Sequence, residues 1–192
     1  LAPLRLEYAL CVPQTPPPPA GFPVVFAIHG GAFMFGRDLT KPPKQLLNSL
    51  EAGEFAVALL SYRLTTEAGL WGDAAVTWPA QSEDLFAAIE DVRARCGAHG
   101  LDGARLAVFG SSAGAFLAAY VATAGTKPPR DLPIKAAVAP APRSPRSSSR
   151  RRHRAFRPSC ASRAGLPSPS PSSNSRMCYE AVVQPLPDSM LA

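Results

Sequence analysis

Apolar runs alternate with amphipathic segments along the first 140 residues of the chain. Residues 22–28 (FPVVFAI) are almost wholly apolar and are bounded by proline and glycine, which is typical of a strand buried in a parallel sheet. Residues 4–10 alternate apolar and polar positions and predict a half-exposed strand. Further strands are predicted at 55–60, 105–109 and 134–139, and helices at 41–52, 79–96 and 112–124. This alternation predicts an α/β fold with a mostly parallel sheet and helices on both of its faces.

The helix predicted at 79–96 has the clearest pattern. Four residues spaced by four, three and four positions share one face that we expect to be buried: Leu85, Ile89, Val92 and Cys96. The sides predicted to face water carry Glu83, Asp84, Glu90, Arg93 and Arg95. Pro79 suits the first turn of this helix, and Gly97 suits its end.

The pattern changes near residue 140. Residues 141–192 are rich in serine, arginine and proline, which predicts a disordered C-terminal tail. The last residues, 177–192, are more apolar but too short to finish a core. We therefore expect a partial domain at 1–140 and a tail at 141–192. We interpret that tail as a non-homologous end, produced by truncation, alternative splicing or a misread gene model.

Charge follows the same division. The net charge is +6, but residues 141–192 hold nine arginines and two acidic residues, which leaves 11 basic and 12 acidic side chains in the first 140. The basic character therefore belongs to the tail, and the body does not favour nucleic acid as a partner. The four cysteines form neither a zinc motif nor a disulfide framework, and no apolar run is long enough to predict a membrane span. No targeting signal is visible, so the compartment stays open, with cytoplasmic as the default expectation.

One segment combines a strand, a turn and a helix around a serine. In LAVFGSSAGAFLAAY (106–120), Ser112 is the centre of a G-x-S-x-G pattern in which Gly110 and Gly114 leave room for a sharp turn. The following helix directs free N–H groups and its positive dipole end at this turn. Ser112 is therefore the candidate nucleophile, and the N–H of Ala113 is a candidate oxyanion donor. An ordinary turn is the alternative.

A second motif, IHGGAF (28–33), directly follows the apolar strand 22–28. Its glycines expose backbone N–H groups in a loop that a ligand can approach closely, so Gly30, Gly31 and Ala32 are the other candidate oxyanion donors. We interpret His29 as a structural histidine that holds this loop through a hydrogen bond. It lies too early in the chain to be the general base of such a layout.

These motifs, with SYRL (61–64) and WPAQSEDLFAAIEDVRARCGAHGLDGARLAVFGSSAGA (78–115), resemble the N-terminal half of an α/β-hydrolase. The similarity covers roughly residues 4–140. It is to esterases and lipases with an H-G-G-G-type oxyanion loop, which include the hormone-sensitive-lipase-like and feruloyl-esterase-like carboxylesterases of α/β-hydrolase fold-3.

The resemblance implies a truncated α/β-hydrolase three-layer sandwich that acts on small-molecule esters and needs neither a metal nor an organic cofactor. It also implies structural roles for Arg63 and Asp84. Two departures keep the chemistry intact: Ala32 replaces the third glycine but retains its N–H, and Ser111 precedes the nucleophile where many relatives have an acidic residue.

The chain offers no well-placed general base. A serine hydroxyl needs a base and an acid that orients it, and in this fold both follow the nucleophile in the sequence. Only His153 follows Ser112, and it lies in a cationic run that lowers its tendency to accept a proton. The downstream acids are no better placed, because Asp131 precedes a strand while Glu180 and Asp188 lie in the tail. We therefore expect an incomplete catalytic triad.

Three functional hypotheses stay open. The first is a serine carboxylic-ester hydrolase, with amide or peptide hydrolysis as a variant on the same fold. The second is a catalytically inactive hydrolase-like binding module. The third is nucleic-acid binding through the tail, where aromatic residues for base stacking are sparse. The aromatic and apolar residues expected to form either an acyl pocket or core are Phe33, Met34, Phe35, Trp71 and Trp78. A sheet that ends near residue 140 leaves an unpaired edge, so we expect self-association, while the oligomeric state stays open.

Overall fold

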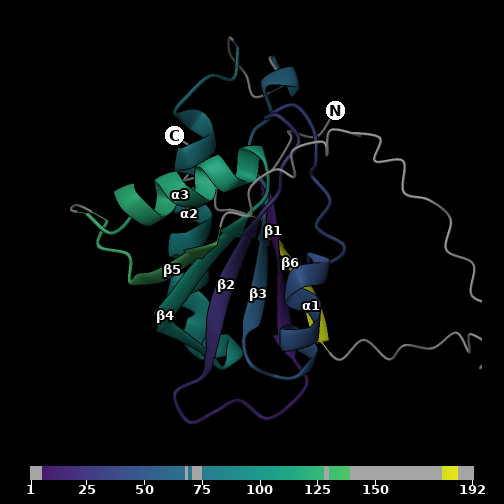
Figure 1. Cartoon of the computed structure of the whole chain (residues 1–192), viewed down its shortest axis with the longest axis vertical. Coiled ribbons are helices and arrows are strands. Elements are labelled where there is room, and N and C mark those ends of the chain that lie inside the picture. Colours follow the sequence, from purple (N-terminus) through teal and green to yellow (C-terminus); the bar gives the residue numbers. More distant parts are fainter. Residues whose placement is uncertain (1–5, 68, 71–74, 128–129, 139–178, 186–192) are drawn as a thin grey trace, which may run out of the picture. The chain divides into compact units, whose positions relative to one another are not determined.

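A six-stranded mixed sheet with the order β5-β4-β2-β3-β1-β6 forms the centre of the fold (Figure 1). The computed structural model describes residues 6–67, 69–70, 75–127, 130–138 and 179–185. The strands are β1 (Glu7–Pro13), β2 (Phe22–Ile28), β3 (Ala56–Leu60), β4 (Leu101–Gly110), β5 (Ile134–Val138) and β6 (Tyr179–Pro185). Strands β2 to β5 run parallel, whereas β1 pairs antiparallel with β3, and β6 pairs antiparallel with β1.

The helices divide between the two faces of the sheet. They are α1 (Lys44–Glu51), α2 (Ala80–Arg95) and α3 (Ala113–Ala124), with short 3-10 turns η1 (Thr65–Glu67) and η2 (Cys96–His99). Because strand side chains alternate between faces, Val24, Phe26 and Ile28 join the core under α2 and α3, whereas Ala27 joins a smaller core with Leu50 of α1. The predicted α/β class, with helices on both faces of a mostly parallel sheet, is confirmed.

Most predicted elements lie within a few residues of the observed ones, and two local expectations are wrong. Helix α2 ends at Arg95 with Cys96 as its C-cap, so Gly97 lies just past its end, as predicted. The turn η2 then continues the chain to Gly100, which adopts the left-handed conformation, with φ 65°, just before β4 begins. Strand β4 consequently starts at Leu101, four residues earlier than predicted. The apolar face of α2 is confirmed, since Leu85, Ile89, Val92 and Cys96 are all buried.

Asp84 is the second wrong expectation, because this carboxylate is only 1 % exposed. It accepts hydrogen bonds from the backbone N–H of Arg63 at 2.8 Å and from its Nε at 2.9 Å, and the Arg63 Nη2 lies 2.8 Å away. Burial raises the pKa of Asp84, while the hydrogen bonds and charge of Arg63 oppose that shift. The pair fixes the loop after β3 to the first turns of α2, as a structural role requires.

Strand β6 comes from the segment that the sequence predicts to be disordered. Its seven residues pair along the whole of β1, from Glu7 opposite Pro185 to Pro13 opposite Tyr179. An apolar stretch too short to finish a core is thus long enough to add one strand to an existing sheet. Residues 139–178 and 186–192 lie outside the described part of the chain, so the division near residue 140 stays a prediction.

Candidate active site

The order of the strands creates a switch point between β2 and β4. From β2 the chain passes through α1 to β3 on one side, and from β3 it returns through α2 to β4 on the other side of β2. The loops that leave β2 and β4 therefore diverge to opposite faces, and ligands bind in such a crevice at the carboxyl ends of the strands. The glycine motif follows β2 and the serine motif follows β4, so the fold brings the two motifs together.

Ser112 lies at a sharp turn between β4 and α3. Its backbone has φ 53° and ψ −122°, a conformation that residues other than glycine rarely adopt, and its side chain is exposed. A Cβ on Gly110 would collide with the carbonyl of Gly114, and one on Gly114 would collide with the carbonyls of Ile28 and His29. The two glycines of the motif thus let the first turn of α3 pack directly on the ends of β4 and β2.

The glycine loop lies against this turn. A Cβ placed on Gly30 would come within 2.7 Å of the Ser111 carbonyl oxygen and 3.2 Å of the Ser112 Cβ. Only a residue without a side chain therefore allows the loop to approach the serine this closely.

The loop conformation leaves backbone donors available. Gly31, Ala32 and Phe33 have positive φ values of 114°, 52° and 62°. The N–H groups of Met34 and Phe35 close the turn by donating to the Gly31 carbonyl at 2.9 and 3.0 Å. Across the described part of the chain, no acceptor is bonded to the candidate oxyanion donors, the N–H groups of Gly30, Gly31, Ala32 and Ala113.

His29 is held in place by the loop and by Tyr62. Its Nδ1 donates a hydrogen bond to the Gly30 carbonyl at 2.7 Å, and its ring stacks on Tyr62 with centroids 4.3 Å apart and an interplanar angle of 11°. The Tyr62 hydroxyl donates to the His29 carbonyl at 3.1 Å. Burial lowers the pKa of His29 and the charge of Arg37 lowers it further, while the bond to Gly30 opposes the shift. A neutral imidazole that supports the loop is consistent with this geometry.

The lowered pKa predicts a pH dependence of stability. As the pH falls below about 6.5, the ordinary histidine value, the unfolded chain takes up a proton that folded His29 resists. The stabilisation is thus complete above that value and is lost as the pH falls through the lower folded pKa. We expect the urea-derived free energy of unfolding to fall more steeply between pH 7 and 5 in the natural chain than in His29→Asn. Asparagine does not titrate but keeps a donor for Gly30, so parallel pH profiles would contradict this role.

Among the described residues, His99 does not lie near the serine. His99 lies in η2 before β4, and the ten residues of β4 put roughly 30 Å between it and Ser112. Asp131 likewise precedes β5, which runs parallel to β4. It therefore lies at the amino ends of the strands, whereas Ser112 lies at their carboxyl ends. His153 and Asp188, as well as the side chain of Glu180, lie outside the described residues.

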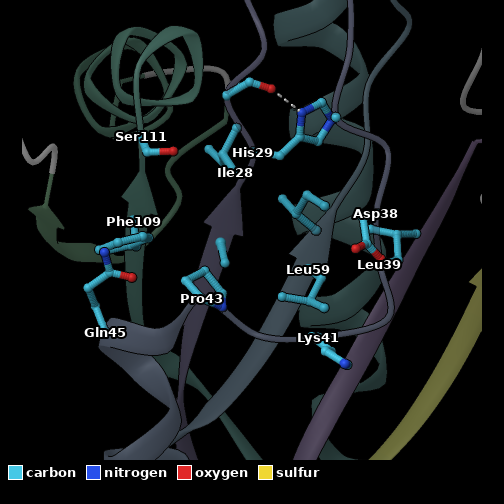
Figure 2. Close-up of a pocket in the computed structure, with 14 residues that line it drawn as sticks. Ile28, His29, Asp38, Leu39, Lys41, Pro43, Gln45, Leu59, Phe109 and Ser111 are labelled. Carbon is cyan, nitrogen blue, oxygen red and sulfur yellow. Dashed lines mark hydrogen bonds between the residues drawn. The ribbon is translucent and has the colours of Figure 1, made fainter. Parts of the chain in front are cut away.

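A cavity of about 250 Å³ opens on the α1 side of the switch point (Figure 2). Ser111, His29 and Gly30 line it from the two motifs, and Phe109 and Leu59 line it from the sheet. Its other wall was not anticipated from the sequence and comprises Asp38, Leu39, Lys41, Pro43 and Gln45. These residues follow the glycine loop or begin α1. Their position after the end of a parallel strand was the one sequence signal that could have indicated that they line a site.

Aromatic side chains gather on the α3 side of the serine. We call Phe33, Trp78, Phe116 and Tyr120 the aromatic shelf. Phe116 meets Phe33 and Trp78 edge-on, with centroids 6.3 and 5.9 Å apart, and Trp78 meets Tyr120 at 4.7 Å. Sequence analysis included Phe33 and Trp78 but missed the two residues of α3, although Phe116 follows Ser112 by about one helical turn.

Three further observations concern the described residues. They contain no cluster of three or more histidine, cysteine, aspartate or glutamate side chains suited to a metal ion. None of the helices in this part is both long and apolar enough to cross a membrane. Cys11 and Cys96 are buried free thiols, and burial raises the pKa of Cys11 to about 11, which makes it a poor nucleophile.

The mixed sheet, its switch point and the serine turn define an α/β-hydrolase. Comparison with protein families identifies the family within this class. The BD-FAE family matches residues 12–140, and the chain belongs to that family. No curated protein is significantly similar to the chain. The predicted resemblance to α/β-hydrolase esterases is confirmed.

Three solved structures to which the chain is similar are esterases. An arylesterase is 26% identical, with 71% of this chain and 41% of that chain covered and a TM-score of 0.56. The thermostable carboxylesterase EstE1, cloned from a metagenomic library, is 29% identical over 70% of this chain and 41% of its own, with a TM-score of 0.55. Esterase LipW from Mycobacterium marinum is 30% identical over 70% and 38%, with a TM-score of 0.56. The chain spans about two fifths of the length of these esterases.

Proposed function

We propose that this chain carries the nucleophile and the oxyanion hole of a serine carboxylic-ester hydrolase. The observation that supports this best is the contact between the two motifs. Ser112 is exposed at a strained turn on the N-terminus of α3, and the loop with free N–H groups approaches it so closely that Gly30 has no room for a Cβ. An exposed serine beside unpaired backbone N–H groups suits the carbonyl group of a small-molecule ester. The similar solved structures are named as esterases.

In the proposed reaction the Ser112 Oγ attacks the ester carbonyl carbon. The carbonyl oxygen becomes an oxyanion, which accepts hydrogen bonds from the N–H groups of Ala113 and of Gly30, Gly31 or Ala32. These donors have no other described acceptor, so little reorganisation is needed when the charge develops. A base must take the hydroxyl proton and then give it to the leaving alcohol, after which water releases the acid from Ser112.

The base is the part of the proposal that the described residues do not supply. The chain has three histidines. His29 donates its Nδ1–H to its own loop, and His99 lies at the amino end of β4, away from Ser112. Within this chain that leaves His153. Ser112 is thus proposed as a correctly held nucleophile whose turnover depends on a histidine outside the described residues.

Covalent labelling tests the nucleophile. The full chain is treated with a fluorophosphonate probe, and the labelled residue is located by mass spectrometry. We expect Ser112 to be labelled, Ser112→Ala to lose the label and Ser111→Ala, changed at the neighbouring hydroxyl, to keep most of it. Hydrolysis of p-nitrophenyl acetate by the same three proteins measures turnover. Equal labelling of the natural chain and both variants would show that Ser112 is not the nucleophile.

The lack of a described base also supports a second candidate function. A hydrolase-like module that binds an ester without cleaving it would retain the crevice but need no proton acceptor. The two functions differ in the same experiment. An unlabelled chain that does not hydrolyse p-nitrophenyl acetate would favour the binding module.

A further inference from the structure

Two unlike surfaces flank Ser112 at the switch point. The aromatic shelf lies with α3 on one face of the sheet, whereas the cavity beside Ser111 lies with α1 on the other face. The cavity wall carries a carboxylate, an ammonium group, an amide and a hydroxyl, from Asp38, Lys41, Gln45 and Ser111. The shelf presents aromatic rings and no charged group, so an ester held at Ser112 would meet different chemistry on its two sides.

Two of the four shelf residues are exposed although the rings contact one another, whereas Phe33 and Tyr120 are half-buried against the core. The side chain of Phe116 is 56 % exposed and that of Trp78 is 47 % exposed, so neither belongs to the core. Contiguous exposed aromatic residues beside a catalytic crevice are more typical of a binding surface than of packing. Edge-on contacts among the rings keep their orientation fixed, which lowers the entropy lost when an apolar group binds.

Phe116 is the member of the shelf nearest to the chemistry along the chain. Its backbone N–H donates to the Ser112 carbonyl at 3.3 Å, which places the ring one helical turn beyond the nucleophile. Its ring also touches Phe33 of the loop that carries the candidate oxyanion donors. A single side chain therefore joins the serine turn, the glycine loop and the segment before α2.

We propose that the aromatic shelf binds the apolar arm of an ester whose carbonyl lies at Ser112, and that Phe116 determines the preference for that arm. This inference rests on the proposed function. The two arms of an ester diverge from the carbonyl, so the other arm points toward the cavity beside Ser111. The substrate class is accordingly an amphipathic ester, with one extended apolar arm and one small polar arm.

Binding can be tested without turnover by using ketones, which share the ester carbonyl but cannot be hydrolysed. Trp78 fluorescence is followed in a Trp71→Phe background while 2-undecanone or 2-butanone is added. We expect a saturable change, with a dissociation constant at least about tenfold lower for 2-undecanone. Phe116→Ser should remove most of this difference and Phe116→Leu part of it. Leu70→Ser alters a 59 % exposed apolar residue outside the shelf and the glycine loop and should leave the difference unchanged.

Labelling rates separate this inference from the proposed function. Fluorophosphonates with a decyl arm and with a triethylene glycol arm are compared on the same variants. Faster labelling of Ser112 by the decyl probe, reduced by Phe116→Ser alone, supports both proposals. Ser112 labelling at equal rates, with no saturable ketone binding, overturns the shelf but not the nucleophile. Ketone binding that depends on Phe116, without any Ser112 labelling, supports the shelf and overturns the proposed function.

Discussion

Replacing Gly114 with valine is expected to lower the free energy of unfolding by about 3 kcal/mol and to abolish labelling of Ser112. A Cβ at this position would overlap the carbonyl groups of Ile28 and His29. Backbone atoms at the end of a central strand cannot rotate away as a flexible side chain can. The first turn of α3 must therefore separate from β2, and the serine turn moves with it.

Gly97→Val is the matched control for this change. Gly97 has no atom within 4 Å of a built Cβ, and its φ lies outside the left-handed region. We expect the free energy of unfolding of this variant to lie within about 0.5 kcal/mol of that of the natural chain. The measurement is urea unfolding followed by circular dichroism, paired with fluorophosphonate labelling. Equal stability of the Gly114 and Gly97 variants would mean that α3 does not pack on β2 as described.

Replacing Asp84 with alanine is expected to cost about 2–3 kcal/mol of folding free energy. The carboxylate is buried, and its removal leaves both the backbone N–H and the guanidinium of Arg63 without their partner. The Arg63 side chain is 21 % exposed, so water recovers part of its solvation, and we place the cost below that of a fully buried ion pair.

Glu90→Ala provides the comparison on the same helix. Glu90 pairs with Arg130 at 3.0 Å, but the two side chains are 41 % and 34 % exposed. Such a surface pair contributes less than about 1 kcal/mol. Urea unfolding of both variants should therefore separate them clearly. A similar loss in the two would show that the buried pair contributes no more than the exposed one.

The sequence predicted the parallel core and the position of both motifs for a physical reason. Strands buried on both faces must be apolar throughout, as residues 22–28 are, and a serine between glycines after such a strand fits few other backbones. The same local logic failed at Asp84. Its burial depends on Arg63, which lies 21 positions away in the sequence, and helical periodicity contains no information about that partner.

Other features depended on tertiary contacts that no local pattern encodes. The polar wall of the cavity comes from a loop without regular periodicity, between Gly36 and Gln45. The start of β4 was predicted four residues too late, because the apolar pattern alone does not show that the strand begins directly after Gly100. The role of Phe116 likewise depends on Phe33 and Trp78 reaching it from two other segments.

Strand β6 imposes an order of events on synthesis. The first strand of the sheet emerges from the ribosome long before the strand that pairs along its outer edge, because Glu7–Pro13 and Tyr179–Pro185 stand near opposite ends of the sequence. Throughout the intervening elongation β1 has an unsatisfied row of N–H and C=O groups, which is a template for association with other chains. The outer edge of β1 is therefore available to other chains until β6 pairs with it.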